Sequence, residues 1–124
     1  GDAFAFLDPV FSSGVYLALK SGALAADAVD AALATGDCSG NRFSAYGQTI
    51  CEGIENMRKL VYAFYSRDFS FARFLQRFPE CKQGVVDILS GNVFTERARA
   101  IFGPMAEMCP LPEDSSLCFY NEEQ

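Results

Sequence analysis

Histidine is absent from the 124 residues, and cysteine occurs only five times. Without an imidazole, the chain has neither a Ser-His nor a Cys-His nucleophile pair. The cysteines are odd in number and lack C-x-x-C spacing, which argues against a zinc site; they are Cys38, Cys51, Cys81, Cys109 and Cys118. We therefore expect no metal site, and we interpret the cysteines as the reduced thiols of a cytoplasmic protein.

A basic surface, a long apolar run and a dinucleotide-binding loop are also missing. The formal net charge is −6, which argues against a nucleic-acid partner because such surfaces are basic. No apolar run reaches the length of a membrane span, and residues 1–18 lack the basic start of a signal peptide. No G-x-G-x-x-G loop occurs. We expect neither nucleic acid nor a membrane as a partner.

The hydrophobic pattern predicts a mainly α fold. Half of the residues are hydrophobic, as in globular proteins. From Ser13 to Thr35 an Ala-rich pattern predicts a helix that ends at Gly36. Small residues on most of its faces suit a helix that packs closely against other helices or a sheet.

A second long helix is predicted from about Asn41 to Ser66. Its apolar residues, spaced by three or four, form one stripe: Phe43, Tyr46, Ile50, Ile54, Met57, Val61 and Phe64. Glu55 and Lys59 lie off this stripe and can pair at i,i+4. We interpret their side of the helix as solvated.

Shorter helices are predicted between Phe71 and Phe102. The aromatic residues between 64 and 78 suit either a hydrophobic core or a wall around a planar substrate, and the core is favoured because aromatics at helical spacing usually pack. A helix opened by Pro79 is expected to turn four residues inward: Val85, Val86, Ile88 and Leu89. Asn92 or Thr95 caps the next helix, which Gly103-Pro104 is expected to interrupt.

The most specific stretch is residues 1–18. Gly1-Asp2-Ala3 precedes Asp8-Pro9-Val10-Phe11-Ser12-Ser13-Gly14-Val15, where the first helix begins. A serine at a helix start caps free amides, and Gly14 leaves no side chain between the backbone and a docking group. The free amides and the positive end of the helix dipole favour an anion or a polarised carbonyl. A plain helix cap would account for the same residues.

This opening resembles the C-terminal flavin motif of FAD-dependent monooxygenases, and within that superfamily it is most similar to the flavin-dependent halogenases. The similarity continues through residues 60–65, 68–71 and 91–94. The resemblance implies a C-terminal fragment of an enzyme with an α/β FAD-binding fold. Residues 1–36 would end the FAD-binding domain, and residues 37–124 would form a C-terminal helical region. The dinucleotide-binding half would lie upstream of Gly1.

The resemblance also implies roles for individual residues. Asp2 of the Gly1-Asp2 pair would hydrogen-bond the ribityl chain of FAD, with Pro9, Ser13, Gly14 and Val15 at the flavin. Ser13 and Gly14 would offer backbone amides to a halide ion. The implied chemistry is that reduced flavin and oxygen form a hydroperoxide, which the halide attacks to give hypohalous acid. The family's catalytic lysine and Trp-x-Trp-x-Ile-Pro motif would lie upstream, so we expect no catalytic residue here and an inactive chain in isolation.

Phe11 departs from the pattern of the tryptophan halogenases, which carry a catalytic glutamate at that position. The departure disfavours free tryptophan and favours a phenolic or pyrrolic substrate, with a carrier-tethered one included. A flavin reductase would supply reduced flavin. The alternatives are a flavin-dependent hydroxylase or reductase, or a non-catalytic helical interaction module. For the isolated chain, the apolar face of helix 13–35 predicts self-association.

Overall fold

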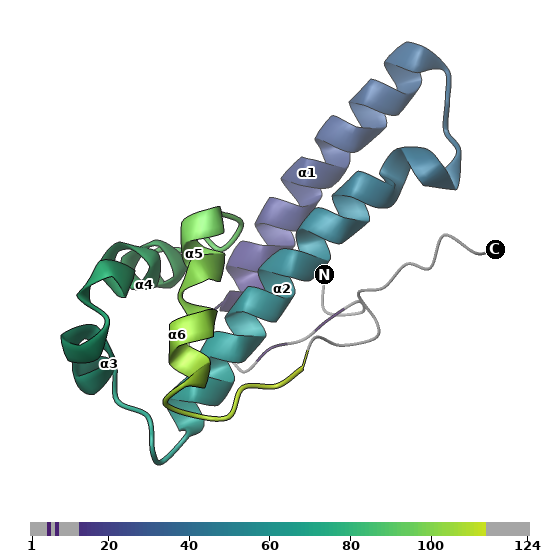
Figure 1. The fold of residues 1–124 in the computed structure, drawn as a ribbon. Coiled ribbons are helices and arrows are strands. Elements are labelled where there is room, and N and C mark those ends of the chain that lie inside the picture. The colour runs from purple at the N-terminus through teal and green to yellow at the C-terminus, as the bar shows by residue number, and fades with distance from the viewer. Residues whose placement is uncertain (1–4, 6, 8–12, 114–124) are drawn as a thin grey trace. The chain divides into compact units, whose positions relative to one another are not determined.

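The computed structural model describes residues 5, 7 and 13–113. Within these residues, helices are the only regular secondary structure, which confirms the predicted mainly α class (Figure 1). The chain divides into two compact units: unit 1 is Gly1–Glu52 with Ser115–Gln124, and unit 2 is Gly53–Asp114. The functional boundary expected after residue 36 refers to a longer protein and stays a prediction. No described helix is both long and apolar enough to cross a membrane.

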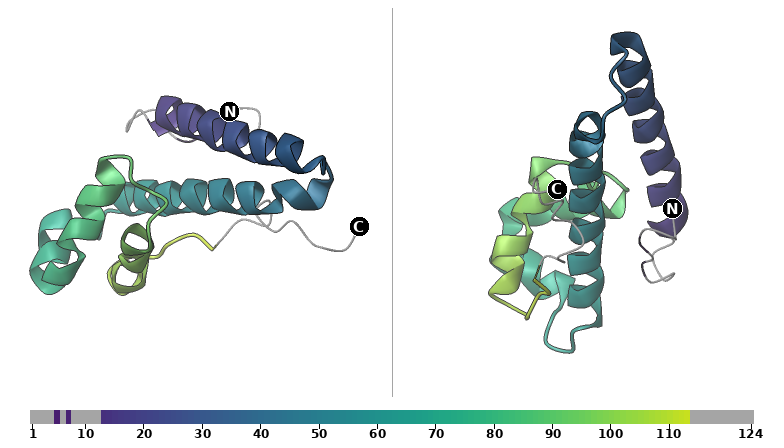
Figure 2. Two further views of the ribbon diagram at one scale, coloured as in Figure 1. Left: turned by 90° about the horizontal axis from the view of Figure 1, so that it is seen from above. Right: turned by 90° about the vertical axis from the view of Figure 1, so that its right-hand side faces the viewer.

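Unit 1 contains α1 (Ser13–Thr35), η2 (Gly40–Phe43) and the beginning of α2 (Ser44–Tyr65). α1 has the bounds predicted from the sequence. It ends at Gly36, whose φ of 69° lies in the left-handed region that favours glycine. The chain then reverses direction (Figure 2). In this turn the Ser39 amide donates to Oδ1 of Asp37 at 3.0 Å, and this hydrogen bond lowers the pKa of the Asp37 carboxyl.

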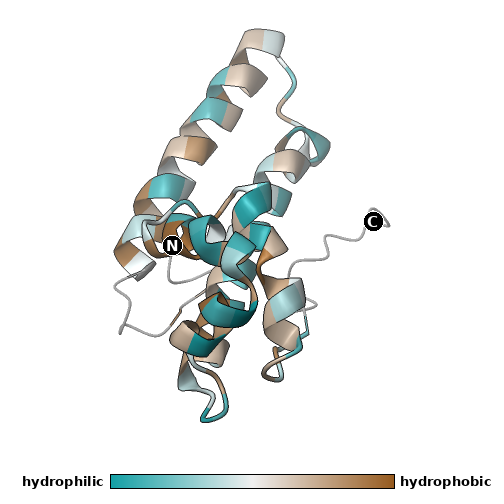
Figure 3. Cartoon of the chain, turned by 60° about the vertical axis from the view of Figure 1, so that its left-hand side comes forward, coloured by the Kyte–Doolittle hydropathy of each residue, from teal (hydrophilic) through white to brown (hydrophobic). Residues whose placement is uncertain are grey.

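One face of α1 is apolar and exposed along the whole helix. Its members alternate in spacing by four and three residues: Val15, Leu19, Gly22, Ala26, Val29 and Leu33. Val15, Leu19 and Leu33 are 71%, 72% and 68% exposed, and the apolar colour recurs along α1 in Figure 3. This spacing forms a continuous stripe on a helix, which we call the outer stripe. A helix with such a face ordinarily packs against a further element.

We expect the 124-residue chain on its own to self-associate through the outer stripe, because burial of apolar surface is worth roughly 25 cal/mol per Å². Leu19→Glu should raise the dissociation constant on the order of tenfold or more, about 1.4 kcal/mol. Ala34→Glu is the matched control, because Ala34 is exposed and lies about 100° around the same helix from Leu33 of the stripe. Sedimentation equilibrium measures both variants. A monomeric wild-type chain at high concentration would contradict the expectation.

Unit 2 contains the rest of α2 followed by five short helices: α3 (Phe71–Arg77), η3 (Pro79–Cys81), α4 (Lys82–Leu89), α5 (Glu96–Ala100) and α6 (Phe102–Ala106). α4 packs on α5. The largest fully buried side chains are all in this unit: Leu60, Phe74, Ile88, Val93, Ile101 and Met105. The described hydrophobic core of the chain is therefore concentrated in unit 2.

Two glycines permit close packing in unit 2. A Cβ added to Gly53 on α2 would overlap the ring of Phe94. A Cβ added to Gly84 on α4 would lie 2.5 Å from both the carbonyl oxygen of Arg97 and Cγ2 of Ile101. At both positions the neighbouring residues exclude a side chain, so these glycines have a packing role.

Buried polar groups attach other segments to α2, and here one expectation is wrong. Glu55 is 6% exposed and accepts hydrogen bonds from Nε and Nη2 of Arg58 at 2.9 and 2.5 Å, so its side of the helix is not solvated. Arg58 also donates to the carbonyl oxygen of Glu113. Asn56, which is buried too, donates from Nδ2 to the carbonyl oxygen of Val93 at 2.8 Å. The Arg58–Glu113 and Asn56–Val93 hydrogen bonds join α2 to residues distant in sequence.

The helices after Pro79 differ from expectation in orientation and in one boundary. Val85 and Ile88 are buried as predicted, but Val86 and Leu89 are exposed, because α4 buries only one side. The interruption expected at Gly103-Pro104 lies slightly earlier, at Ile101, between α5 and α6. Gly103 and Pro104 both lie in the first turn of α6, where the missing amide of proline costs no helical hydrogen bond.

Of the two candidate caps for α5, Thr95 is the residue that caps the helix. Its Oγ1 accepts a hydrogen bond from the Ala98 amide at 3.1 Å. This is the usual N-cap geometry, in which a side-chain oxygen satisfies a free amide of the first turn.

Candidate cofactor site at the start of helix α1

The structure describes three of the residues predicted to bind the cofactor, and all three begin α1. Ser13 is its first residue, followed by Gly14 and Val15. The structure thus brings these three together on one helical turn. The predicted residues Gly1, Asp2 and Pro9 lie outside the described residues, and their roles stay predictions.

The backbone at the start of α1 can bind an electron-rich group. The first four amides of an α-helix have no carbonyl partner within the helix, and the positive end of the helix dipole lies beside them. The first turn of α1 contains no acidic residue, so the helix itself supplies no carboxylate to offset that charge. An anion or a polarised carbonyl oxygen is the complementary ligand.

Gly14 differs from the packing glycines of unit 2. A Cβ at Gly14 would meet no atom within 4 Å, and Gly14 is not among the glycines with positive φ. Neither backbone conformation nor packing against the described residues therefore requires glycine here. Gly22 and Gly47 have the same open space, and the flavin contact of Gly14 stays a prediction.

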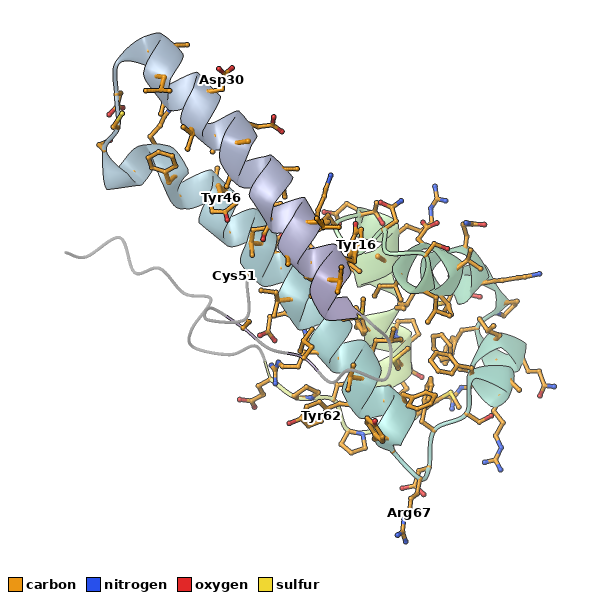
Figure 4. All side chains as sticks on the ribbon, turned by 180° about the vertical axis from the view of Figure 1, so that it is seen from behind. Tyr16, Asp30, Tyr46, Cys51, Tyr62 and Arg67 are labelled. Atoms are coloured by element: carbon orange, nitrogen blue, oxygen red, sulfur yellow. The ribbon has the colours of Figure 1, made fainter. Side chains whose placement is uncertain are left out.

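Tyr16 lies close to this turn and was not predicted as a site residue (Figure 4). Burial raises the pKa of its phenol, so the hydroxyl stays protonated at neutral pH. Successive helical residues are rotated by about 100°, so the side chain of Tyr16 and the open position at Gly14 lie on nearly opposite sides of α1. We therefore do not assign Tyr16 to the cofactor site.

The described thiols do not form a second catalytic site. Cys51 is buried, Cys81 and Cys109 are buried with free thiols, and the free thiol of Cys38 is exposed. Burial raises the pKa of the thiols of Cys81 and Cys109, which reduces their thiolate population and hence their reactivity. Among residues 13–113, no group of three or more histidine, cysteine, aspartate or glutamate residues could hold a metal ion.

The aromatic cluster of unit 2 is mainly core. Phe74 is fully buried, and its ring centroid lies 5.7 Å from that of Phe69 and 5.6 Å from that of Phe78. Phe64 and Tyr65, at the end of α2, are instead exposed and contact each other edge to face at 5.5 Å. The cluster thus stabilises unit 2 through packing around Phe74.

Two curated relatives resemble the chain over most of its length. It is 32% identical over 108 residues to the 1H-pyrrole-2-carbonyl peptidyl-carrier-protein chlorinase of Pseudomonas fluorescens, a match covering 87% of this chain and 24% of the chlorinase. It is 35% identical over 94 residues to the corresponding brominase of Pseudoalteromonas luteoviolacea, covering 76% of this chain and 23% of the brominase. No family model and no solved structure matches the chain.

The chain spans about a quarter of the length of these relatives. A match of 108 residues extends well beyond the opening motif, because residues 1–18 can supply at most 18 of them. The similarity therefore includes the helical region as well. The resemblance to the flavin-dependent halogenases is confirmed, and the chain is related to a segment of these enzymes.

Proposed function

We propose that the chain is part of an FAD-dependent halogenase that acts on a pyrrole ring held as a thioester on a carrier protein. The observation that carries this proposal is the similarity, over 87% of the chain, to a chlorinase named for that substrate. The second relative is named for the same acyl group but for bromination. The pair favours a pyrrolic over a phenolic substrate and leaves the halide open. In this protein, residues 1–36 close the FAD-binding domain and residues 37–124 form a helical region.

The start of α1 would hold the flavin edge and the halide. FAD, when bound and reduced, supplies the activation of oxygen that oxidises the halide. The residues of this chain bind and orient: the amides of Ser13 and Gly14 donate to the halide, Val15 continues the turn at the flavin, and Asp2 and Pro9 contact the cofactor from the preceding segment. Fixed donors of this kind stabilise charge that develops during a reaction and are often worth on the order of a hundredfold in rate.

Two further features belong to the proposal. A flavin reductase supplies reduced flavin to the enzyme. The enzyme works in the cytoplasm, where free thiols such as the exposed Cys38 stay reduced.

The test is product analysis with the full-length protein. A carrier protein loaded with a pyrrole-2-carbonyl thioester is incubated with enzyme, FAD, a flavin reductase, oxygen, and chloride or bromide. Intact-mass spectrometry should show replacement of ring hydrogen by halogen. Addition of oxygen would instead identify a hydroxylase, and flavin turnover with an unchanged thioester would identify a reductase. Either result contradicts the proposal.

The outer stripe of α1 is the observation that favours the alternative of a non-catalytic interaction module. An exposed apolar face suits a partner helix as well as it suits the remainder of a larger enzyme. The halogenase and the interaction module differ in flavin content. An interaction module would bind no flavin, either as the full-length protein or as the 124-residue chain.

A further inference from the structure

Charge is unevenly divided between the two units. Residues 1–52 and 115–124 contain eight acidic and two basic side chains, whereas residues 53–114 contain eight of each. The net charge of −6 therefore belongs to unit 1, and unit 2 is formally neutral. An anionic partner would be repelled by unit 1 but not by unit 2.

The described ion pairs of unit 2 leave some of its basic side chains without a carboxylate partner. The pairs are Arg58–Glu55, Arg77–Glu107, Arg97–Asp87 and Arg99–Glu96. Arg67, Arg73 and Lys82 are exposed and form no ion pair or hydrogen bond with the described part of the chain. Their charges are available to a ligand.

These three residues belong to the segment of residues 67–82, which contains α3. Arg67 is in the turn between α2 and α3, where Figure 4 shows it pointing away from the helices; Arg73 is on α3, and Lys82 begins α4. Arg77 shares the side of Arg73, since the two are four residues apart on one helix. Its pair with Glu107 joins two side chains that are both more than half exposed, and such pairs are weak. We call Arg67, Arg73, Arg77 and Lys82 the basic patch.

The acidic residues of this segment do not neutralise the patch. Asp68 and Glu80 are the acidic residues of the segment 67–82, two against the four basic residues of the patch. Neither carboxylate forms an ion pair with a described basic residue. The patch is therefore a local excess of positive charge on an otherwise neutral unit.

We propose that the basic patch docks the carrier protein, with Arg67 and Arg73 facing the phosphate of its phosphopantetheine arm. This inference rests on the proposed function. The arm joins the carrier to the thioester through a phosphodiester, so a negative charge stands at the carrier surface whatever acyl group is attached. Arginine is suited to that group because its guanidinium donates two parallel hydrogen bonds to phosphate oxygens. A nucleic acid fits less well, because the chain as a whole is acidic.

Binding of the loaded carrier to the full-length protein tests the docking site. Arg67→Glu combined with Arg73→Glu should raise the dissociation constant, measured by fluorescence anisotropy, on the order of tenfold or more at low salt. Added salt should weaken wild-type binding more than binding of this variant. The matched control is Arg97→Glu with Arg99→Glu, the same charge change on α5 at residues that already have carboxylate partners. The control should bind like the wild type.

A carrier that lacks the arm separates the phosphate from the rest of the carrier surface. The patch variant should lose affinity mainly for the arm-bearing carrier; an equal loss for both forms overturns the phosphate contact. Equal binding by wild type and patch variant, an equal loss in the control variant, or displacement of the carrier by RNA with the same dependence on the patch overturns the docking site.

A pyrrole-2-carbonyl thioester of free pantetheine, without carrier or phosphate, distinguishes this inference from the proposed function. Its halogenation should proceed with the same kcat/KM in the wild type and the patch variant. If the wild type halogenates neither thioester, the proposed function fails. The carrier-binding measurement still tests whether the basic patch is a docking site. If kcat/KM for free pantetheine falls as far as for the carrier, the patch acts in the reaction rather than in docking, and the inference is overturned.

Discussion

Gly14→Val in the full-length protein should lower halogenation turnover by about a hundredfold or more, because a branched side chain would occupy the position that the proposed site gives to the flavin edge and the halide. The fold should tolerate the change to within about 1 kcal/mol, since no described atom lies within 4 Å of the added Cβ and valine forms helix better than glycine. Steady-state kinetics and thermal unfolding measure the two effects separately.

Two controls distinguish the site at Gly14 from a general effect on the helices. Gly47→Val is the matched change, because Gly47 is helical and also has open space at the Cβ position; its turnover should stay near that of the wild type. Ser13→Ala should be milder than Gly14→Val, since the amides remain after the hydroxyl is lost. Normal flavin content and normal turnover in Gly14→Val would show that this turn is only a helix cap and not a cofactor site.

Phe74→Ala should destabilise unit 2 by about 3–5 kcal/mol, the usual cost of removing a buried aromatic ring. Phe74 is fully buried, and its ring packs against those of Phe69 and Phe78. Phe64→Ala, at an exposed position on α2, should cost no more than about 1 kcal/mol. Urea unfolding of the 124-residue chain followed by circular dichroism gives both values. Equal losses would show that the ring of Phe74 does not anchor the core.

The long helices were predictable because their signals are local. Gly36 ends α1 through a backbone conformation that other residues avoid, and the apolar spacing of α2 follows from helical periodicity. The burial of Glu55 was not predictable in this way. It depends on Arg58, whose guanidinium also bonds the backbone of Glu113, and a contact across that distance in sequence leaves no periodic signal.

The boundaries of the short helices were not predicted correctly, for a related reason. Gly103-Pro104 can end one helix or begin another, and the choice depends on the packing of Ile101 and Phe102, which are both buried. Similarly, the hydrophobicity of Val86 and Leu89 does not reveal which side of α4 meets the rest of unit 2. Tertiary contacts decide between local alternatives of nearly equal energy.

The candidate site shows the same division between local and distant information. Ser13, Gly14 and Val15 were placed correctly at the start of a helix, because capping residues and glycine are local signals. The group that would face this turn is not part of the described chain, so its identity rests on the family resemblance and stays a prediction. The open space at Gly14 is the feature that only the structure supplied.

Flavin retention tests the central claim, that this chain completes the flavin site of a larger halogenase, most directly. The full-length protein and the 124-residue chain are each mixed with FAD, passed through gel filtration and examined by absorbance. We predict a bound-flavin spectrum for the full-length protein and none for the isolated chain, because the chain offers one helix start and a short preceding segment to a large dinucleotide. A full-length protein without flavin, or an isolated chain that retains it, would contradict the claim.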